Sequence, residues 1–404
     1  MTTPSYAATV ASGSDLPATK PANNTYFPAL DGLRALAFLM VFAQHYLQVP
    51  YGWTGVDVFF VLSGFLITGI LYDTREQPHR VRNFYVRRTL RIFPLYYGIM
   101  LLLVVSYPLL RWQWNWAWLV WPAYVGNFCR GIYPYAHLSG MERLANFAPL
   151  STTIPRFQLL MGHFWSLCVE EQFYLFWPWV VFWIRDRRKL MVVCAACVVI
   201  CPVMRMVGNH ALPQWMLDQE VLYRWTPFRV DALLLGGLVA LVRRGPSARG
   251  LLVAARLVFC TLALIFVGFL GYWSRHLGQG LTHPTWALTR GVMFVDLVSA
   301  CLIVMALETG SITYRIFNLR PLRWVGRISY GAYVFHDIFH LLILAVVMQF
   351  TSHFKYGTAA TALVFTLLVS WASFRWYETP FIRLKERWTR RLTEVGEHSF
   401  YADH

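Results

Sequence analysis

The first apolar segment of the chain reads Leu30-Asp31-Gly32-Leu33-Arg34-Ala35-Leu36-Ala37-Phe38-Leu39-Met40-Val41-Phe42-Ala43-Gln44-His45. Its composition predicts a membrane-spanning helix, yet it carries Asp31, Arg34 and His45. A charged side chain at the centre of such a helix costs about 2.5–3.5 kcal/mol on insertion scales, so it points to function. Arg34 and His45 fall on nearly the same helix face, roughly 16 Å apart along the axis. We interpret them as two functional positions along one substrate path through the lipid bilayer.

The composition of the whole chain is that of a membrane protein. Of its 404 residues, 57% are hydrophobic and only 14% are charged, whereas a soluble protein carries about 25% charged residues. Repeated apolar runs predict an all-α, polytopic transmembrane helical bundle. The ten expected spans are 30–50, 54–72, 93–110, 164–184, 189–207, 229–243, 251–273, 290–308, 328–349 and 358–377.

The positions of Lys and Arg set the expected topology. The formal net charge is +16, and we expect these residues to direct topology from short cytoplasmic loops rather than to bind nucleic acid. Ten spans then place both termini in the cytoplasm. Residues 112–127 are rich in Trp. If they crossed the membrane, fewer Lys and Arg residues would fall on the cytoplasmic side, so an interfacial or re-entrant segment is expected there.

Three domains follow from this topology. Residues 1–25 are rich in Ser, Thr, Ala and Pro and predict a disordered tail. Residues 26–383 form the transmembrane domain, and residues 384–404 form a cytoplasmic tail.

Two arginines mark the segment between the second and third spans. It reads Arg82-Asn83-Phe84-Tyr85-Val86-Arg87-Arg88-Thr89-Leu90-Arg91-Ile92-Phe93-Pro94, and Arg88 and Arg91 share one helix face. Guanidinium groups can hold phosphate oxygens in bidentate fashion. A phosphate-bearing cytoplasmic donor such as coenzyme A would fit this pair. Lipid headgroup binding and a purely topological role are the alternatives.

The fourth span opens with a polar stripe. It begins His163-Phe164-Trp165-Ser166-Leu167-Cys168-Val169-Glu170-Glu171-Gln172-Phe173-Tyr174, and Ser166, Glu170 and Tyr174 follow one another at i,i+4 spacing. Counted from the outer ends of their helices, Glu170 and His45 lie about 9 and 7 Å deep. We therefore predict Glu170 as the carboxylate that orients His45 and sets its protonation.

Three more ionisable groups fall inside expected spans. Asp57 lies in the second span, Arg229 at the outer end of the sixth, and His336 in the ninth. Groups of this kind usually line a substrate path, and we expect that here. His336 and His340 are four residues apart, but no third ligand stands at a suitable spacing, so no metal site is expected.

Five motifs together resemble the acyltransferase-3 family of bacterial integral membrane O-acyltransferases. They are Asp31-Gly32-Leu33-Arg34 with an Arg-x10-His pair ending at His45, Gly55-Val56-Asp57-Val58-Phe59-Phe60-Val61-Leu62-Ser63-Gly64-Phe65, Arg88-x-x-Arg91-Ile92-x-Pro94, Phe164-Trp165-Ser166-Leu167-x-Val169-Glu170-Glu171-Gln172-Phe173-Tyr174, and Ile328-Ser329-Tyr330 through His336. The resemblance covers residues 26–383. Cys168 and the ending His336-Asp337-Ile338 depart from the family pattern.

The resemblance implies a location and a reaction. Family members are multi-pass proteins of the bacterial inner membrane. They move an acyl group, usually acetyl from acetyl-CoA, onto a sugar hydroxyl of a surface glycan, a glycolipid or a secondary metabolite. Acyl-CoA would thus be a co-substrate here, with no bound cofactor, and its phosphates are expected on Arg34, Arg88 and Arg91.

One mechanistic hypothesis joins the residues to the resemblance. His45 is expected to act as general base on the acceptor hydroxyl, with Glu170 or Asp31 setting its protonation state. Direct transfer and an acyl-histidine intermediate both remain open. The residues expected along the acceptor path are Asp57, Ser166, Tyr174, Arg229 and His336.

A different class of function is also compatible with the sequence. A transporter or flippase could use the same intramembrane charges as its substrate path, although we find no inverted repeat of the transporter kind. The alternatives differ in whether acyl-CoA is consumed. The acceptor, the length of the acyl group and the oligomeric state are not set by the sequence.

Overall fold

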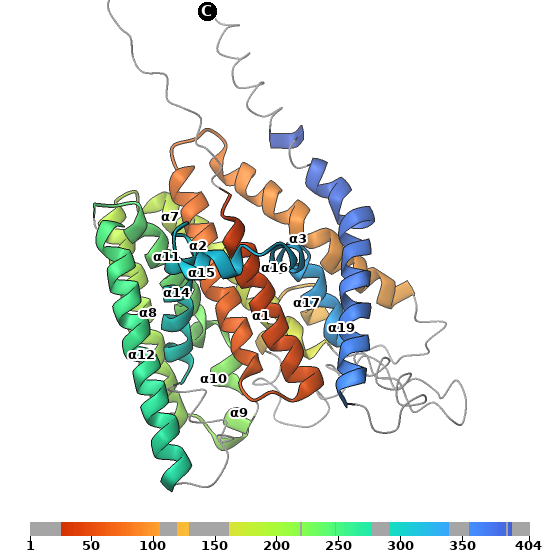
Figure 1. Ribbon diagram of the computed structural model, residues 1–404. Helices are drawn as coiled ribbons and strands as arrows, with labels where there is room; N and C mark the ends of the chain where they lie inside the picture. The colour runs from red at the N-terminus through yellow and green to blue at the C-terminus, as the bar shows by residue number, and fades with distance from the viewer. Residues whose placement is uncertain are drawn as a thin grey trace, which may run out of the picture.

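The computed structural model describes residues 26–105, 119–128, 161–218, 220–246, 248–276, 291–338, 355–384 and 387–389, and the regular structure in these ranges is helical throughout. Figure 1 shows the long helices gathered into one bundle. The α-helices are α1 (Pro28–Leu47), α2 (Gly55–Asp73), α3 (Arg80–Val105), α7 (Trp165–Trp183), α8 (Arg187–Ala211), α9 (Gln214–Asp218), α10 (Val221–Arg224), α11 (Val230–Arg243), α12 (Ala248–His276), α14 (Val292–Ala306), α15 (Ile312–Phe317), α16 (Arg320–Arg327), α17 (Ser329–Ile338) and α19 (Lys355–Ala372). Shorter turns are η1 (Gly52–Thr54), η3 (Gly126–Phe128), η5 (Gly162–Phe164), η6 (Thr226–Phe228) and the π-helical η8 (Ser373–Glu378).

Five helical segments in the described ranges are long and apolar enough to cross a membrane. By length and composition these are Gly52–Asp73, Arg80–Val105, Arg187–Ala211, Gly250–Gly268 and Tyr356–Thr389. The helix α14 is equally apolar but shorter. The helical class expected from the sequence is therefore confirmed for the described residues, and the candidate spans agree with a membrane protein, whereas the count of ten spans stays a prediction.

The largest departure from the sequence prediction is α3. A cytoplasmic loop was expected up to residue 92, followed by a new helix, but Arg80–Val105 is one continuous helix with Pro94 inside it. Proline removes one backbone hydrogen bond from a helix, and neighbouring helices in a membrane bundle can compensate for that loss. Arg88 and Arg91 are consequently carried by the same rigid element as the third span.

The segment between α14 and α17 is also more ordered than a connecting loop. It forms α15 and α16, which lie across the beginning of α1 (Figure 1). A methyl group on Gly32 would overlap the carbonyl of Phe317, and one on Gly326 would overlap the carbonyl of Asp31. These contacts between backbones fix the end of α1 that carries Asp31.

Helices α2 and α11 cross in close contact in the bundle interior. A methyl group on Gly64 would overlap the carbonyl of Leu233, and one on Gly236 would overlap the carbonyl of Val61. Glycine at such positions allows helix backbones to approach closely in membranes. The crossing sets the position of Ser63, which faces the cavity described below.

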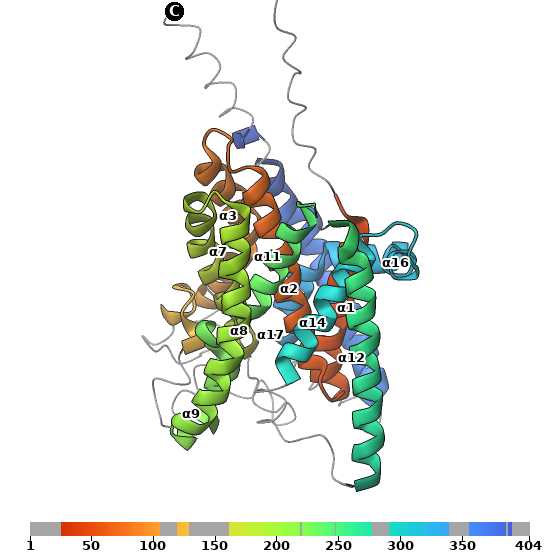
Figure 2. The same ribbon diagram turned by 90° about the vertical axis from the view of Figure 1, so that its left-hand side faces the viewer.

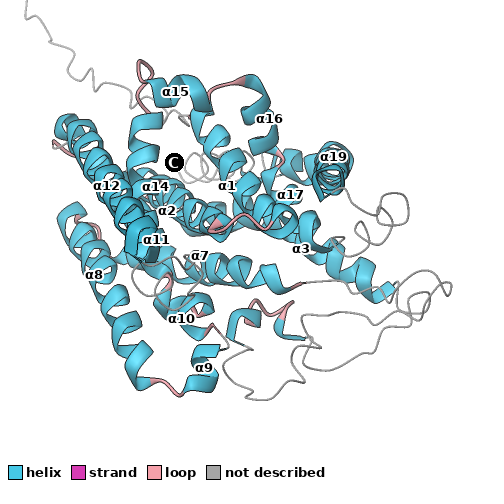
Figure 3. Cartoon of the chain, turned by 60° about the horizontal axis from the view of Figure 1, so that its bottom comes forward, coloured by secondary structure: helices cyan, strands magenta, loops and turns pink. Residues whose placement is uncertain are grey.

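Helices α8 and α12 form one side of the bundle and α19 lies at the other (Figures 1 and 3). Figure 2 shows α12 along one edge of the molecule. Large apolar side chains such as Leu257 and Leu264 are exposed on α12, as Val199 is on α8. Apolar surface of this extent is typical of helices that face lipid.

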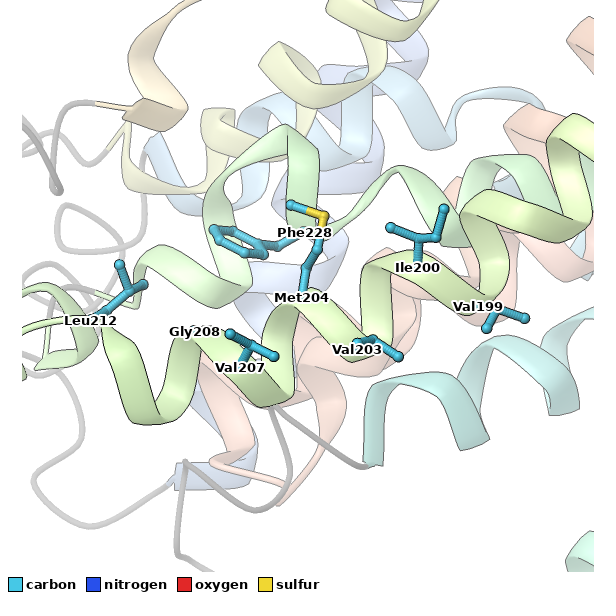
Figure 4. Close-up of a pocket in the computed structure, with 8 residues that line it drawn as sticks. All are labelled: Val199, Ile200, Val203, Met204, Val207, Gly208, Leu212 and Phe228. Atoms are coloured by element: carbon cyan, nitrogen blue, oxygen red, sulfur yellow. The ribbon is translucent and has the colours of Figure 1, made fainter.

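A hollow on the outer face of α8 is apolar throughout. It has a volume of about 390 Å³, and Figure 4 shows its lining side chains projecting from α8 together with Phe228 from η6. The lining residues are Val199, Ile200, Val203, Met204, Val207, Gly208, Leu212 and Phe228. Since no ionisable or hydroxyl group reaches this hollow, it is not the site of the chemistry.

Several sequence predictions fall outside the described residues. These are the N-terminal tail 1–25, most of the C-terminal tail 384–404, the stretch 112–118 and the second half of the ninth span. Residues 119–128, at the end of the Trp-rich stretch, form turns and the short η3.

Candidate active site

A cavity of about 100 Å³ lies between α1, α2, α3, α7 and α17. Five of the residues predicted from the sequence line it, namely Arg34, Arg88, Arg91, Ser166 and Glu170. Its other polar lining residues are Ser63, Glu171, Arg327, Ser329, Tyr330 and Tyr333. Six different helices, α16 with Arg327 among them, thus bring guanidinium groups, carboxylates and hydroxyl groups around one space.

Guanidinium groups dominate one end of the cavity. Arg34 forms an ion pair with Asp31 at 2.7 Å, one turn earlier on α1. The second carboxylate oxygen of Asp31 accepts a hydrogen bond of 2.6 Å from the Tyr26 hydroxyl. Among the described residues, no carboxylate lies within ion-pair distance of Arg91 or Arg327. This end therefore carries positive charge that the described chain does not fully balance.

Arg88 is held by an aromatic ring. Its guanidinium carbon lies 3.6 Å from the ring centroid of Tyr174, and its Nε lies 3.9 Å from Glu171 Oε1. Stacking occupies the face of a guanidinium and leaves its in-plane N–H groups for hydrogen bonds. Tyr174 is buried and holds Arg88 in place, and its expected place on the acceptor path stays a prediction.

Glu170 does not sit beside His45, as the depth estimate had suggested. Its Oε1 accepts a hydrogen bond of 2.5 Å from Ser63 on α2. Asp31 is no nearer to the histidine, because it lies at the opposite end of α1. The depth of a residue along a helix axis does not determine which side of the helix it faces. Glu170 lies on the side of α7 that faces the arginines.

The carboxylate beside His45 is Asp337. Its Oδ1 lies 3.2 Å from His45 Nδ1, and its Oδ2 lies 3.2 Å from His163 Nδ1. His336 packs edge-on against both imidazoles, with ring centroids 5.1 Å from His45 and 5.0 Å from His163. Three histidines and one carboxylate from α1, η5 and α17 therefore form one group, which we call the histidine cluster.

A hydrogen-bonded pair connects the cavity to the histidine cluster. The hydroxyl groups of Ser166 and Tyr333 lie 2.6 Å apart, and both residues line the cavity. Each hydroxyl also lies 3.1 Å from the backbone carbonyl of His163. The cavity thus extends from the arginines to Ser166 and Tyr333, and the histidine cluster lies directly behind these two residues.

Asp57 and Arg229 lie elsewhere. They form a fully buried ion pair with each other, beside a second buried pair of Arg205 and Asp231 at 2.7 Å. Asp296 on α14 is also fully buried nearby. Neither Asp57 nor Arg229 lines the cavity, and their expected place on the acceptor path stays a prediction.

Sequence reasoning missed His163 and Asp337. Asp337 is an ionisable group inside an expected span, so the rule that singled out Asp57 applied to it equally. His163 lies in η5, two residues before α7, and was quoted at the start of the fourth span without being given a role. Its position at the start of the polar stripe was the available signal.

Metal ligation finds no support among the described residues. No group of three or more His, Cys, Asp or Glu side chains in those ranges has a geometry that could hold a metal ion. His340 lies outside the described residues.

Known proteins resemble this chain over most of its length. A family model described as an acyltransferase domain, Acyl_transf_3, matches residues 27–375. The peptidoglycan O-acetyltransferase OatA of Listeria monocytogenes is 29% identical over 377 residues, covering 88% of this chain and 56% of the relative. The putative peptidoglycan O-acetyltransferase YrhL of Bacillus subtilis is 29% identical over 385 residues, covering 89% of this chain and 56% of the relative.

A more distant relative is the O-acetyltransferase OatA of Staphylococcus aureus, 24% identical over 371 residues, which cover 88% of this chain and 57% of the relative. The chain thus spans somewhat more than half the length of these relatives. No solved structure matches it. The family match extends over α1, α2, α3, α7 and α17, the helices that build the cavity and the histidine cluster. The chain therefore belongs to the acyltransferase-3 family.

Proposed function

We propose that this protein is a membrane O-acyltransferase that moves an acetyl group from acetyl-CoA to a sugar hydroxyl of a cell-surface glycan. One observation carries the proposal: a cavity lined by four arginines leads to an imidazole–carboxylate pair. Such an arrangement suits a donor with several phosphates at one end and proton transfer at the other. The names of the relatives make peptidoglycan the favoured acceptor.

The donor would bind at the arginine end. Arg91 and Arg327 have no carboxylate partner among the described residues, and Arg88 is stacked so that its N–H groups remain available. Phosphate oxygens are the natural partners of such guanidinium groups. The acyl-pantetheine arm would then extend along the cavity toward Ser166 and Tyr333.

His45 would supply the general base. It stands on α1 at the far end of the path, and Asp337 would hold its Nδ1–H so that Nε2 can accept a proton. The acceptor oxygen loses its proton to His45 and forms the new C–O bond with the acyl carbon. The C–S bond of the thioester breaks, and the departing thiolate takes the proton from His45.

Membrane topology completes the proposal. We place the protein in the bacterial inner membrane, with both termini in the cytoplasm and about ten spans. The arginine end of the cavity then faces the cytoplasm, where acyl-CoA is found, and His45 lies in the outer half near the acceptor.

The decisive experiment replaces His45 by Ala in cells that depend on this protein for glycan O-acetylation. Mass spectrometry of the surface glycan should show loss of the acetyl ester while protein abundance is unchanged. The matched control is His210→Ala, because His210 is an exposed histidine at the end of α8. Retained acetylation in the His45 variant would remove it from the mechanism. Absence of any acetyl-CoA consumption by the wild-type protein would instead favour the transporter alternative.

A further inference from the structure

The segment between α14 and α17 has one face that the bundle leaves exposed. Figure 1 shows α15 and α16 lying across the direction of α1, and Figure 2 shows α16 standing out from the side of the bundle. The large apolar side chains exposed on this segment are Ile312, Ile316, Leu319 and Trp324. Ile312 alone is 75% exposed. So many exposed apolar side chains on two short helices indicate a surface that contacts something other than water.

The opposite face fixes the segment to the bundle. Phe317 is buried in the main hydrophobic core. The Ser311 hydroxyl caps α15, because it accepts a hydrogen bond of 2.9 Å from the backbone N–H of Tyr314. The same hydroxyl donates a hydrogen bond of 2.6 Å to the carbonyl of Met305. Together with the close backbone contacts to α1 described above, these interactions give the exposed side chains a fixed direction.

Arginine side chains alternate with the exposed apolar ones. Residues 309–327 contain four arginines and no Asp or Glu. Arg315 and Arg320 are exposed, and neither pairs with a carboxylate among the described residues. The Nε atom of Arg323 is shielded from solvent and has no hydrogen-bond partner in the same ranges. These guanidinium groups therefore have N–H donors available for an anion from outside the bundle.

We infer that this face lies in the membrane interface and binds the headgroups of anionic phospholipids. We call it the α15–α16 surface, formed by Ile312, Arg315, Ile316, Leu319, Arg320 and Trp324. A segment with arginines and large apolar side chains on one exposed face suits the boundary between headgroups and acyl chains. Trp is enriched at that depth, and the apolar stem of an arginine can lie along lipid while its guanidinium reaches a phosphate. The inference does not depend on the proposed enzymatic function.

A second basic stretch lacks the apolar part of this arrangement. The first turns of α3 expose Arg82 and Arg87, but no large apolar side chain is exposed between residues 80 and 100, all of which the structure describes. Charge alone attracts an anionic membrane loosely and is screened by salt, whereas charge combined with apolar anchors retains a lipid. The two pairs of arginines carry the same charge and thus provide a matched comparison.

The α15–α16 surface is connected to the candidate active site. Arg327, the last residue of α16, lines the cavity, and its neighbour Gly326 lies against the carbonyl of Asp31. A lipid held on this surface would therefore stabilise the element that carries one of the four cavity arginines.

The experiment uses the full chain in detergent micelles, where native mass spectrometry measures how much phosphatidylglycerol the protein retains. Phosphatidylcholine with the same acyl chains is the neutral comparison. Each basic residue near a membrane surface strengthens binding about fivefold, so Arg315→Gln with Arg320→Gln should weaken retention roughly 30-fold. The matched control, Arg82→Gln with Arg87→Gln, should weaken it by less than about fivefold. Equal losses for the two double variants, or equal retention of the two lipids by the wild-type protein, would overturn the inference.

Further variants separate lipid binding from misfolding and from binding of small anions. Arg315→Lys with Arg320→Lys keeps the charge and should retain the lipid. Ile312→Gln with Ile316→Gln should weaken retention although every arginine remains, and unchanged retention would contradict the apolar part of the surface. Inorganic phosphate, added at constant ionic strength, should not displace phosphatidylglycerol. Displacement by phosphate would mean a site for small anions and would overturn the assignment to lipid.

Thermal unfolding provides a second readout. Phosphatidylglycerol should raise the unfolding temperature of the wild-type protein, because a ligand that binds only the folded state stabilises it. It should have little effect on the Arg315→Gln, Arg320→Gln variant. An equal rise for both proteins would place the stabilising lipid elsewhere and overturn the inference.

Discussion

The intramembrane carboxylate beside His45 is Asp337, not Glu170 as the sequence suggested. Glu170 lies at the depth estimated for His45 but points to Ser63 and the arginines. Asp337 comes from α17, far along the chain, and reaches both His45 and His163. Counting residues along a helix fixes height, whereas the partner of a side chain depends on which helices are neighbours.

Asp337→Asn should lower kcat strongly. An amide at this position can present its N–H group to His45 and so favour the wrong tautomer, and proton transfer of this kind contributes about 10²- to 10⁴-fold to rate. Initial rates of thiol release from acetyl-CoA measure the effect. Glu76→Gln is the control because Glu76 is an exposed carboxylate between α2 and α3. Equal rates for the two variants would exclude Asp337 from catalysis.

Arg91→Gln should weaken donor binding. A hydrogen bond to a charged group contributes about 1.5–3 kcal/mol, so KM for acetyl-CoA should rise roughly tenfold or more with a smaller change in kcat. Arg87→Gln is the matched control, since Arg87 lies on the exposed face of the same helix. Titration with dephospho analogues of the donor would show which phosphate contact is lost. An unchanged KM would mean that Arg91 does not bind the phosphate groups of acetyl-CoA.

At the scale of elements, pairs of helices are joined by charge as well as by close packing. The Asp57–Arg229 pair joins α2 to the beginning of α11, and the Arg205–Asp231 pair joins α8 to the same helix. Both pairs are buried. They belong to the architecture that holds the cavity in shape rather than to the cavity itself.

Asp57→Asn should destabilise the protein by about 3–5 kcal/mol, because it leaves a buried guanidinium without its partner. The double variant Asp57→Leu with Arg229→Met should recover part of this loss. Thermal unfolding in detergent measures both. The control is Asp73→Asn, which breaks the more exposed ion pair with Arg244 and should cost about 0–1 kcal/mol. Equal losses for the buried and exposed pairs would contradict this account.

Gly64→Ala should separate α2 from α11. Its new methyl group would overlap the carbonyl of Leu233, and overpacking of this kind costs about 1–3 kcal/mol. Gly250→Ala on α12 meets no atom within 4 Å, so it should be neutral or stabilise its helix by up to about 1 kcal/mol. Unfolding temperatures of the two variants test the contrast. An unchanged unfolding temperature for Gly64→Ala would mean that α2 and α11 can move apart without loss of stability.

Local patterns predicted the helices well and the contacts poorly. The apolar runs around α1, α2, α7 and α11 gave bounds within a few residues of those observed. The beginning of α3 was placed too late, because the charged residues up to Arg91 were interpreted as a loop before the apolar segment. Asp57 and Arg229 were recognised as unusual, but nothing in their local sequence indicates that they pair across 172 positions.

At the scale of the whole molecule, the arrangement suggests a directional enzyme. The arginine end and the histidine cluster lie toward opposite ends of α1, with the cavity between them. The match to the acyltransferase-3 family covers all of these elements. A donor and an acceptor could thus approach from the two sides of the membrane without either crossing it.

Sealed membrane vesicles test this directionality. Acetyl-CoA does not cross a bilayer, so external donor should support glycan acetylation in inside-out vesicles and not in right-side-out ones. Radiolabelled acetyl groups on the glycan are the readout, and permeabilised vesicles of both kinds serve as the control. Equal labelling in the two sealed preparations would mean that the arginine end does not face the cytoplasm.

The pairing of Asp57 with Arg229 also has a consequence for biosynthesis. The two residues are 172 positions apart, and at ribosomal rates of about 5–20 residues per second the aspartate is made roughly 10–30 s before its partner. During that interval α2 holds an uncompensated acid while the later helices are still being inserted. Quality-control proteases of the membrane would therefore have a defined period in which a chain that stalls before α11 can be recognised and removed.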